Sequence, residues 1–170
     1  MEFVVLVDRD NKKVGVEEKL KAHIDGKLHR AFSILVFNSK GELLLQQRAK
    51  SKYHCPGLWS NTCCSHPRPG ESYFRAVHRR LREEMGFDCA LKKHFCFVYK
   101  AKFSNGLTEH EHDTVFVGRF DGKPELNRKE AMAYRWMPLD ELKKDIKAHP
   151  AKYTYWFKKA LKSKLFKQSF

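Results

Sequence analysis

The sequence predicts an α+β fold of the mixed α/β kind, a sandwich in which helices pack on a β-sheet. Three observations support this class: short apolar runs of strand type, hairpin-type turns between some of them, and separate segments with helical spacing of apolar residues. Strands mixed with separated helices are expected to form a sheet covered by helices. The 170 residues, 42% of them apolar, fit one domain spanning residues 1–170.

The first part of the chain is expected to be β-structure. Phe3–Val7 is a short apolar run of strand type, and the following Asp8–Asn11 has the composition of a turn. Ala31–Phe37 and Glu42–Gln46 are two further runs of this type. The residues between them, Asn38–Gly41, are typical of a hairpin turn, so the two runs are expected to pair.

A helix is expected over Glu71–Met85. Its apolar residues recur at spacings of three, four and four, which places them on one helix face. These residues are Phe74, Val77, Leu81 and Met85. Gly86 follows, and glycine suits the left-handed conformation that ends many helices.

The remainder is expected to contain three more strands and two more helices. The strands are Phe95–Lys102, Asp113–Phe120 and Tyr134–Met137, and the helices are Leu139–Ile146 and Tyr153–Leu165. Ser104–Gly106 supplies a turn between the first two of these strands. The last helix should place Tyr153, Trp156, Phe157, Ala160 and Leu161 on one side.

The net charge of +14 favours an anionic partner: a nucleic acid, an acidic membrane or a phosphorylated small molecule. The chain shows neither the aromatic motif of RNA-binding domains nor a helix-turn-helix signature. Pairs such as Lys143–Lys144 and Lys158–Lys159 are more often solvated faces of helices.

Membrane and secretory signals are not expected. A membrane span needs roughly 20 apolar residues, and charged residues follow too soon after the N-terminus for a signal peptide. The five cysteines are an odd number, and the neighbours Cys63 and Cys64 are poorly placed to bridge each other. Reduced thiols in the cytoplasm are therefore expected.

Three separate segments offer side chains of metal-binding type: His23–His29, Asn61–Pro67 and Glu109–Glu111. In a strand, the period of two places Glu109 and Glu111 on one face. A shared metal would need that pairing. On these residues alone, two solvent-exposed carboxylates are at least as good an interpretation.

Residues 65–86 resemble the Nudix box when counted back from Gly86. The matching positions are Glu71, Arg79, Leu81, Glu83, Glu84 and Gly86. Ser65 stands where the box has its first glycine, and Arg80 stands where it has a glutamate. Hydrolases of nucleoside diphosphate derivatives need that glutamate for their metal, so its loss argues against ordinary hydrolysis.

These departures, together with Asn61–Pro67, Leu28–Phe32 and Glu109–Glu111, closely resemble the type 1 isopentenyl-diphosphate isomerases. The resemblance extends from about Val4 to Phe157. It implies a single Nudix-type isomerase domain, a sheet packed by helices. It also implies interconversion of isopentenyl and dimethylallyl diphosphate by protonation and deprotonation, in isoprenoid biosynthesis.

The resemblance implies an acid and a base on opposite faces of the substrate. Cys64 matches the thiol that removes the allylic proton, and a thiol has a reference pKa within tuning range of neutrality. Glu111 matches the opposing carboxylate, with Tyr99 close by to pass or orient the proton. The alternative for Cys64 is a buried structural role, which is the usual one for a free cysteine. That role is expected for Cys55, Cys63, Cys89 and Cys96.

The resemblance also implies a tightly bound divalent metal. Its ligands would be His23, His29, His66, Glu109 and Glu111. Such a set suits manganese or zinc, and also iron, by ligand type. A Mg²⁺ ion that enters with the substrate diphosphate would be held by Glu84. The other histidines are expected to be structural or on the surface: His54, His78, His94, His112 and His149.

The substrate-binding residues follow from the same resemblance. Lys19, Arg48, Lys52 and Arg80 match diphosphate-binding positions, and guanidinium groups pair well with phosphate oxygens. Trp156 matches an aromatic cap over the hydrocarbon end, where its face would stabilise positive charge. A core tryptophan is the alternative.

The partner is therefore expected to be a small isoprenyl diphosphate, without nucleic acid or membrane, and the protein a monomer or weak dimer. Two other functions remain open. One is a Nudix hydrolase acting on a nucleoside diphosphate derivative, and the other is a nucleic-acid-binding module that uses the positive charge.

Overall fold

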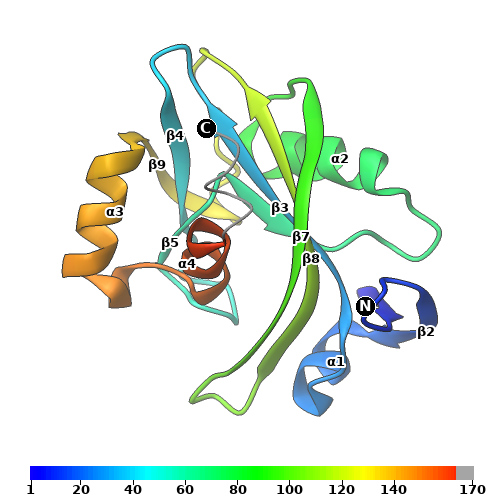
Figure 1. The fold of residues 1–170 in the computed structure, drawn as a ribbon. Helices are drawn as coiled ribbons and strands as arrows, with labels where there is room; N and C mark the ends of the chain where they lie inside the picture. Colours follow the sequence, from blue (N-terminus) through cyan, green and yellow to red (C-terminus); the bar gives the residue numbers. More distant parts are fainter. Residues whose placement is uncertain (164–170) are drawn as a thin grey trace.

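A mixed β-sheet of nine strands runs through residues 1–163, which are the residues that the computed structural model describes (Figure 1). The strands are β1 (Phe3–Val7), β2 (Lys13–Glu18), β3 (His29–Phe37), β4 (Glu42–Arg48), β5 (Trp59–Ser60), β6 (Cys63–Ser65), β7 (Leu91–Lys102), β8 (Thr108–Arg119) and β9 (Ala131–Pro138). The helices are α1 (Lys19–Asp25), α2 (Tyr73–Met85), α3 (Leu139–Ala148) and α4 (Tyr155–Lys162), with a 3₁₀ turn at Pro150–Lys152.

Strand β3 is central to the pairing. It runs parallel to β8 and antiparallel to β1, β4 and β6. Strands β7 and β8 form a long antiparallel hairpin, and β4 also pairs with β5 and β9. The predicted hairpin of β3 and β4 is confirmed, with Gly41 N donating to Asn38 O in its turn.

The side chains of β3 alternate between two cores, as the period of two in a strand requires. Ile34 and Val36 belong to a core that includes the buried face of α2. Leu35 and Phe37 belong to a second core that includes buried residues of α3 and α4. Helices therefore cover both faces of the sheet, and the predicted α+β class is confirmed.

Helix α2 begins two residues later than predicted, where the Ser72 hydroxyl accepts a hydrogen bond from Arg75 N. It ends at Gly86, whose φ of 73° is left-handed. Leu81 is fully buried, but Phe74 is 69% exposed, so the prediction that both share the buried face is wrong for Phe74. Its ring contacts His78 in the first turns, because helical spacing does not tell how much of a helix lies over the sheet.

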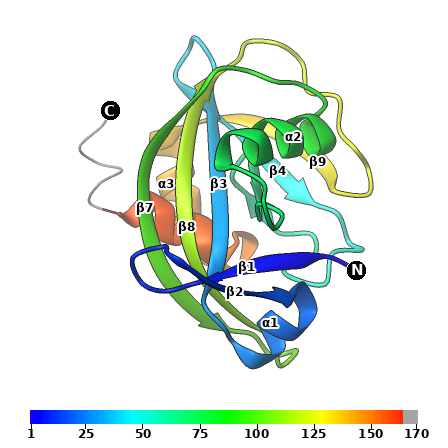
Figure 2. The same ribbon diagram turned by 90° about the vertical axis from the view of Figure 1, so that its right-hand side faces the viewer.

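Strand β2 and helix α1 were not predicted from the sequence. No residue of β2 is fully buried, so it lacks the buried apolar face that marks a half-buried strand. Helix α1 is only seven residues long; the Glu18 carboxylate caps its start and Gly26 its end. Figure 2 shows β1, β2 and α1 grouped at the first residues of β3, where Leu6 pairs with His29.

The later elements were predicted with errors at their ends. Strands β7 and β8 begin earlier than the apolar runs that indicated them, because polar residues continue the pairing. Strand β9 also begins earlier, at Ala131, and ends at Pro138. Helix α4 begins at Tyr155, and Tyr153 instead forms an isolated bridge with Trp59. The predicted helix end at Leu165 lies outside the described residues.

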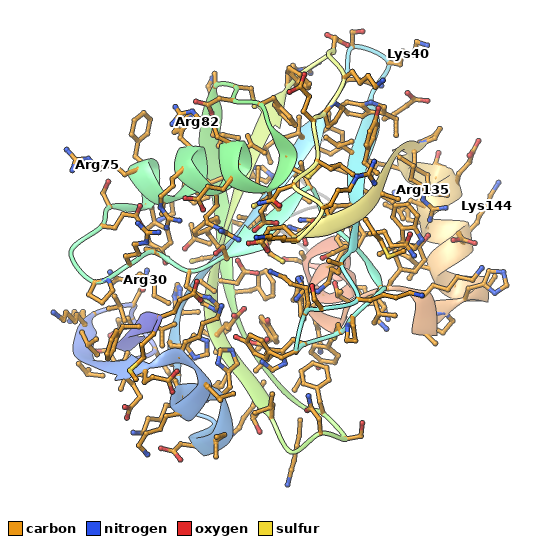
Figure 3. The ribbon with its side chains drawn as sticks, turned by 180° about the vertical axis from the view of Figure 1, so that it is seen from behind. Arg30, Lys40, Arg75, Arg82, Arg135 and Lys144 are labelled. Atoms are coloured by element: carbon orange, nitrogen blue, oxygen red, sulfur yellow. The ribbon has the colours of Figure 1, made fainter. Side chains whose placement is uncertain are left out.

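Basic side chains lie on several elements around the molecule. Figure 3 labels residues of this kind on β3 (Arg30), the turn after it (Lys40), α2 (Arg75 and Arg82), β9 (Arg135) and α3 (Lys144). Within residues 1–163, none of the helices has the length and apolar character to cross a membrane.

Replacement of Leu81 by alanine should lower the free energy of unfolding by about 2–5 kcal/mol, because it opens a cavity in a fully buried part of the α2 core. Phe74→Ala removes a larger but exposed side chain from the same helix, and it should change this quantity by less than about 1 kcal/mol. Urea unfolding of both variants measures the difference. Equal losses would contradict the assignment of the buried face.

Candidate functional site

The pairing register of three strands places His29, Tyr99 and Glu111 in one row. His29 of β3 pairs with Glu111 of β8, and Glu111 pairs with Tyr99 of β7. Residues that pair across a sheet point to the same face. The Tyr99 hydroxyl donates to Glu111 Oε2 at 2.5 Å, and His29 Nε2 lies 3.6 Å from Glu111 Oε1.

Two further histidines reach this row from other elements. His23 comes from α1, with Nε2 3.2 Å from Glu109 Oε2, and His66 follows β6, with Nε2 2.8 Å from Glu111 Oε1. Ligand atoms of His23, His29, His66 and Glu111 all lie within 4.8 Å of one another. Glu109 and Glu111 are both buried, which rules out the alternative of two solvent-exposed carboxylates.

Backbone carbonyls set the tautomers of two of these histidines. The Nδ1 of His23 donates to Lys19 O at 2.5 Å, and the Nδ1 of His29 donates to Lys27 O at 2.9 Å. In the neutral rings, the lone pair is therefore on Nε2, which faces the carboxylates. His29 Nε2 is buried without a hydrogen bond. A buried set of imidazole and carboxylate donors, held in this tautomer, fits a divalent metal.

Burial is the largest single influence on the pKa values of His66, Tyr99 and Glu111. It lowers the pKa of His66 to about 3, so this imidazole is neutral. Burial also raises the pKa of Glu111, but the imidazoles of His29 and His66 outweigh it and hold that pKa well below its usual range. Burial and the adjacent Glu111 charge raise the pKa of Tyr99 well above that of a free phenol, which makes Tyr99 a neutral donor.

The structure adds His54 to the cluster, a histidine expected from its sequence context to be structural or on the surface. Its Nε2 lies 3.5 Å from Glu109 Oε1, and its ring nitrogen lies within 4.8 Å of ligand atoms of His23 and Glu109. Burial, with His23 and Arg48 nearby, lowers the pKa of His54 to about 3. The loop between β4 and β5 brings it there, and no linear motif marks that contact.

Cys64 lies in β6, where it pairs with Ser33 of β3. Its neighbour Cys63 packs into the α2 core, so the alternation of the short strand directs the two thiols to different surroundings. Burial raises the pKa of the Cys64 thiol to about 12, and the nearby Arg48 guanidinium opposes this shift. Arg48 Nη1 is 3.8 Å from Cys64 Sγ.

One cavity joins most of the predicted site residues. It is lined by Cys64, Tyr99, Glu109, Glu111, His23, His66 and Trp156, by the cations Lys19, Arg48, Lys52 and Arg80, and by Tyr53 and His54. Lys19, Lys52 and Arg80 also line an adjoining groove that contains Arg68, Arg79 and Lys129. Three of the four predicted diphosphate-binding side chains therefore lie where the two hollows join, and Arg48 lines the first cavity alone.

Carboxylates pair with three of these cations. Glu130 binds Lys52 and lies 3.0 Å from Arg80, and Glu2 lies 2.8 Å from Lys19. Neither glutamate was singled out in the sequence. Trp156 is buried, donates to Ser60 Oγ at 3.0 Å and has the Arg48 guanidinium 5.2 Å from its ring centre.

Glu84 lies apart from the histidine cluster. It is buried in α2 and accepts hydrogen bonds from Arg80 at 2.6 Å and Gln46 at 2.8 Å. It is among neither the cavity-lining residues nor the ligand groups within 4.8 Å. Its connection to the cavity runs through Arg80, which lines the cavity.

Residues 27–157 match the model of the NUDIX domain family. The chain is 56% identical over 153 residues to an isopentenyl-diphosphate Delta-isomerase 2 of Aromatoleum aromaticum, covering 90% of this chain and 81% of the relative. It is 52% identical to a protein of the same name from Photorhabdus laumondii, covering 94% and 90%.

The fold is also similar to solved structures. A crystal structure of a Deinococcus radiodurans protein superposes with a TM-score of 0.70 at 21% identity, covering 86% of this chain and 90% of the other. At that identity, the likeness supports the arrangement of strands and helices alone.

Removal of the Arg80 charge should destabilise the unliganded protein. Arg80→Met leaves the buried Glu84 carboxylate without its cation, and we expect a loss of about 3 kcal/mol in the free energy of unfolding. Arg82→Met is the control, because Arg82 is 61% exposed and its pair with Asp88 should contribute under about 1 kcal/mol. Urea unfolding compares them, and equal effects would contradict a buried Arg80–Glu84 pair.

Proposed function

This chain belongs to the isopentenyl-diphosphate Delta-isomerase family of NUDIX domain proteins, and we propose on that premise that its cavity interconverts isopentenyl diphosphate and dimethylallyl diphosphate. The enzyme is an isomerase of isoprenoid biosynthesis. The observation that carries the assignment of roles is the joint lining of one cavity by Cys64 and by the hydrogen-bonded pair of Tyr99 and Glu111.

The isomerisation requires one proton to be added and another removed. Tyr99 and Glu111 together deliver a proton to the exocyclic alkene carbon, and Cys64 removes a proton from the neighbouring allylic carbon. The neutral Tyr99 phenol, already donating to Glu111, is suited to pass this proton. The alkene bond shifts by one position, and the substrate neither gains nor loses atoms overall.

The protonation state of Cys64 matters for this assignment. A base must be the thiolate. Burial favours the thiol form of Cys64, and the Arg48 guanidinium favours the thiolate. In the reverse direction, the thiol is the form that donates. Cys64 therefore gives back on the return reaction the proton that it takes on the forward one.

The histidine and carboxylate cluster is proposed to hold one divalent metal, manganese or zinc, with iron also suited to the donor set. When bound, the cation would neutralise the buried carboxylates and make the proton shared by Tyr99 and Glu111 easier to transfer. The ligands are His23, His29, His66, Glu109 and Glu111. Mg²⁺ accompanying the diphosphate is proposed to bind Glu84, which is separated from the cluster and adjoins Arg80.

Lys19, Arg48, Lys52 and Arg80 are proposed to bind the diphosphate. Glu2 and Glu130 pair with three of these cations in the unliganded protein, so the substrate phosphates would exchange with carboxylates. The ring of Trp156 lines the same cavity and would cover the hydrocarbon end, where its face stabilises developing positive charge.

We also propose that residues 1–170 act as one domain and as a monomer or weak dimer. All of the proposed catalytic, metal and substrate residues that line the cavity come from one copy of the chain. A second subunit is therefore not needed to complete the cavity.

Cys64→Ser and Glu111→Gln should each keep the fold and lower turnover by about 10²–10⁴-fold, because each removes one proton-transfer group. The measurement is an NMR time course with isopentenyl diphosphate and Mg²⁺ in deuterated water, following the exocyclic methylene signal and deuterium incorporation. Cys96→Ser changes an exposed thiol outside the cavity and should leave turnover unchanged. Near-normal turnover in either variant would refute its assigned role.

Removal of the tight metal should abolish conversion even when Mg²⁺ is present. Extraction with a chelator, followed by addition of one equivalent of Mn²⁺ or Zn²⁺, should remove and then restore the activity. His29→Ala should purify with far less metal than the wild-type protein, as elemental analysis would show, because His29 Nε2 faces the cluster. His78→Ala, which alters a histidine paired with Asp88 on α2, should retain its metal. Full metal content in His29→Ala would contradict the proposed ligand set.

A further inference from the structure

His54 occupies a buried position beside the proposed metal ligands, although its sequence context predicts a structural or surface residue. It is 4% exposed, and its Nε2 faces Glu109 Oε1 at 3.5 Å. The ring centres of His54 and His23 are 4.7 Å apart. Neither nitrogen of His54 makes a hydrogen bond to any described residue.

We propose that His54 is a further ligand of the divalent metal held by this cluster, supplying a fourth imidazole beside His23, His29 and His66. This proposal rests on the metal-binding role proposed above for the cluster. It extends that role to a residue of the loop between β4 and β5.

A purely structural role explains this position poorly. A neutral imidazole always carries one N–H, and a buried donor left without an acceptor costs about 1–3 kcal/mol. A phenyl ring would fill the same space, between Tyr53 and Phe103, without that cost. A buried ring with two unpaired nitrogens, one of them facing a carboxylate, is suited to a cation instead.

The lone pairs indicate one shared ion rather than two separate ions. Ligand atoms of His23, His54 and Glu109 form one group, and those of His23, His29, His66 and Glu111 form another. The groups share His23, whose Nδ1 donates to Lys19 O and leaves Nε2 as its only lone pair. Because one lone pair binds one ion, the two groups that share it are parts of a single centre.

The loop holds His54 in place before any ligand binds. Arg48 donates from Nε and Nη2 to His54 O at 3.1 and 3.0 Å, which ties the backbone to the end of β4. The rings of Tyr53 and Phe103 lie 4.5 and 5.7 Å from the imidazole. Arg48 therefore positions His54 while its other terminal nitrogen lies near Cys64.

A fourth imidazole would affect metal choice. Imidazole nitrogens suit zinc, cobalt and iron, whereas magnesium and manganese prefer oxygen ligands. The additional nitrogen should therefore strengthen binding of zinc and cobalt more than binding of manganese.

The test uses Co²⁺ as the probe with the full-length wild-type protein and two variants, His54→Phe and His54→Gln. Visible absorption reports the ligands around Co²⁺, and competition with a chelator gives its dissociation constant. Both variants should shift the absorption bands and weaken Co²⁺ binding by about 10–100-fold, the range seen when metal-site partners are lost. Phenylalanine preserves the packing, and glutamine keeps a polar side chain if phenylalanine disturbs folding.

The control is His78→Phe, which removes a histidine of α2 outside the cluster and should leave bands and affinity unchanged. Wild-type bands and an affinity within about twofold in both folded His54 variants would overturn the assignment of His54 alone. Failure of the wild-type protein to bind Co²⁺ would overturn the metal centre, including His54. The isomerase assay is separate, and its result would show whether the proposed function survives either outcome.

Discussion

The burial of Glu109 and Glu111 on one face of β8 is the constraint on which the site depends. A buried carboxylate is costly unless charges or hydrogen bonds compensate it. Here the compensation comes from separate parts of the chain: His23 from α1, His29 from β3, His66 after β6 and Tyr99 from β7. The sheet and the N-terminal segment thus converge on two carboxylates.

The hydrogen bonds around these carboxylates leave some imidazole nitrogens unpaired, which indicates a metal-binding role. Backbone carbonyls hold Nδ1 of His23 and His29, so their lone pairs face the carboxylates, and nitrogens of His29 and His54 are left without hydrogen bonds. The imidazoles of His54 and His66, whose pKa values burial lowers to about 3, add no positive charge to offset the negative charge of the ionised Glu111. A divalent cation would balance that charge and use those lone pairs.

Strand pairing also separates the two proposed proton-transfer groups. Glu111 and Tyr99 lie on β8 and β7, on one side of β3, and Cys64 lies on β6, which pairs with another edge of β3. The rigid sheet therefore keeps an acid and a base apart across one cavity, while Arg48 links Cys64 to the loop of His54. Sites built on strands hold such geometry more precisely than loops.

The sequence by itself determined the strands β1, β3, β4, β7, β8 and β9, helix α2 and its stop at Gly86, and the family. These features depend on local periodicity, turn chemistry and motif spacing. It also indicated that Glu109 and Glu111 share a face, since strand alternation is a local rule. Only the tertiary structure showed that those carboxylates are buried. It also showed that His23 lies in helix α1 and that His54 lies beside Glu109. It also showed Phe74 exposed despite its helical spacing, and Glu130 paired with Lys52 and Arg80. These facts depend on contacts between segments distant in the chain, and no local pattern encodes such contacts.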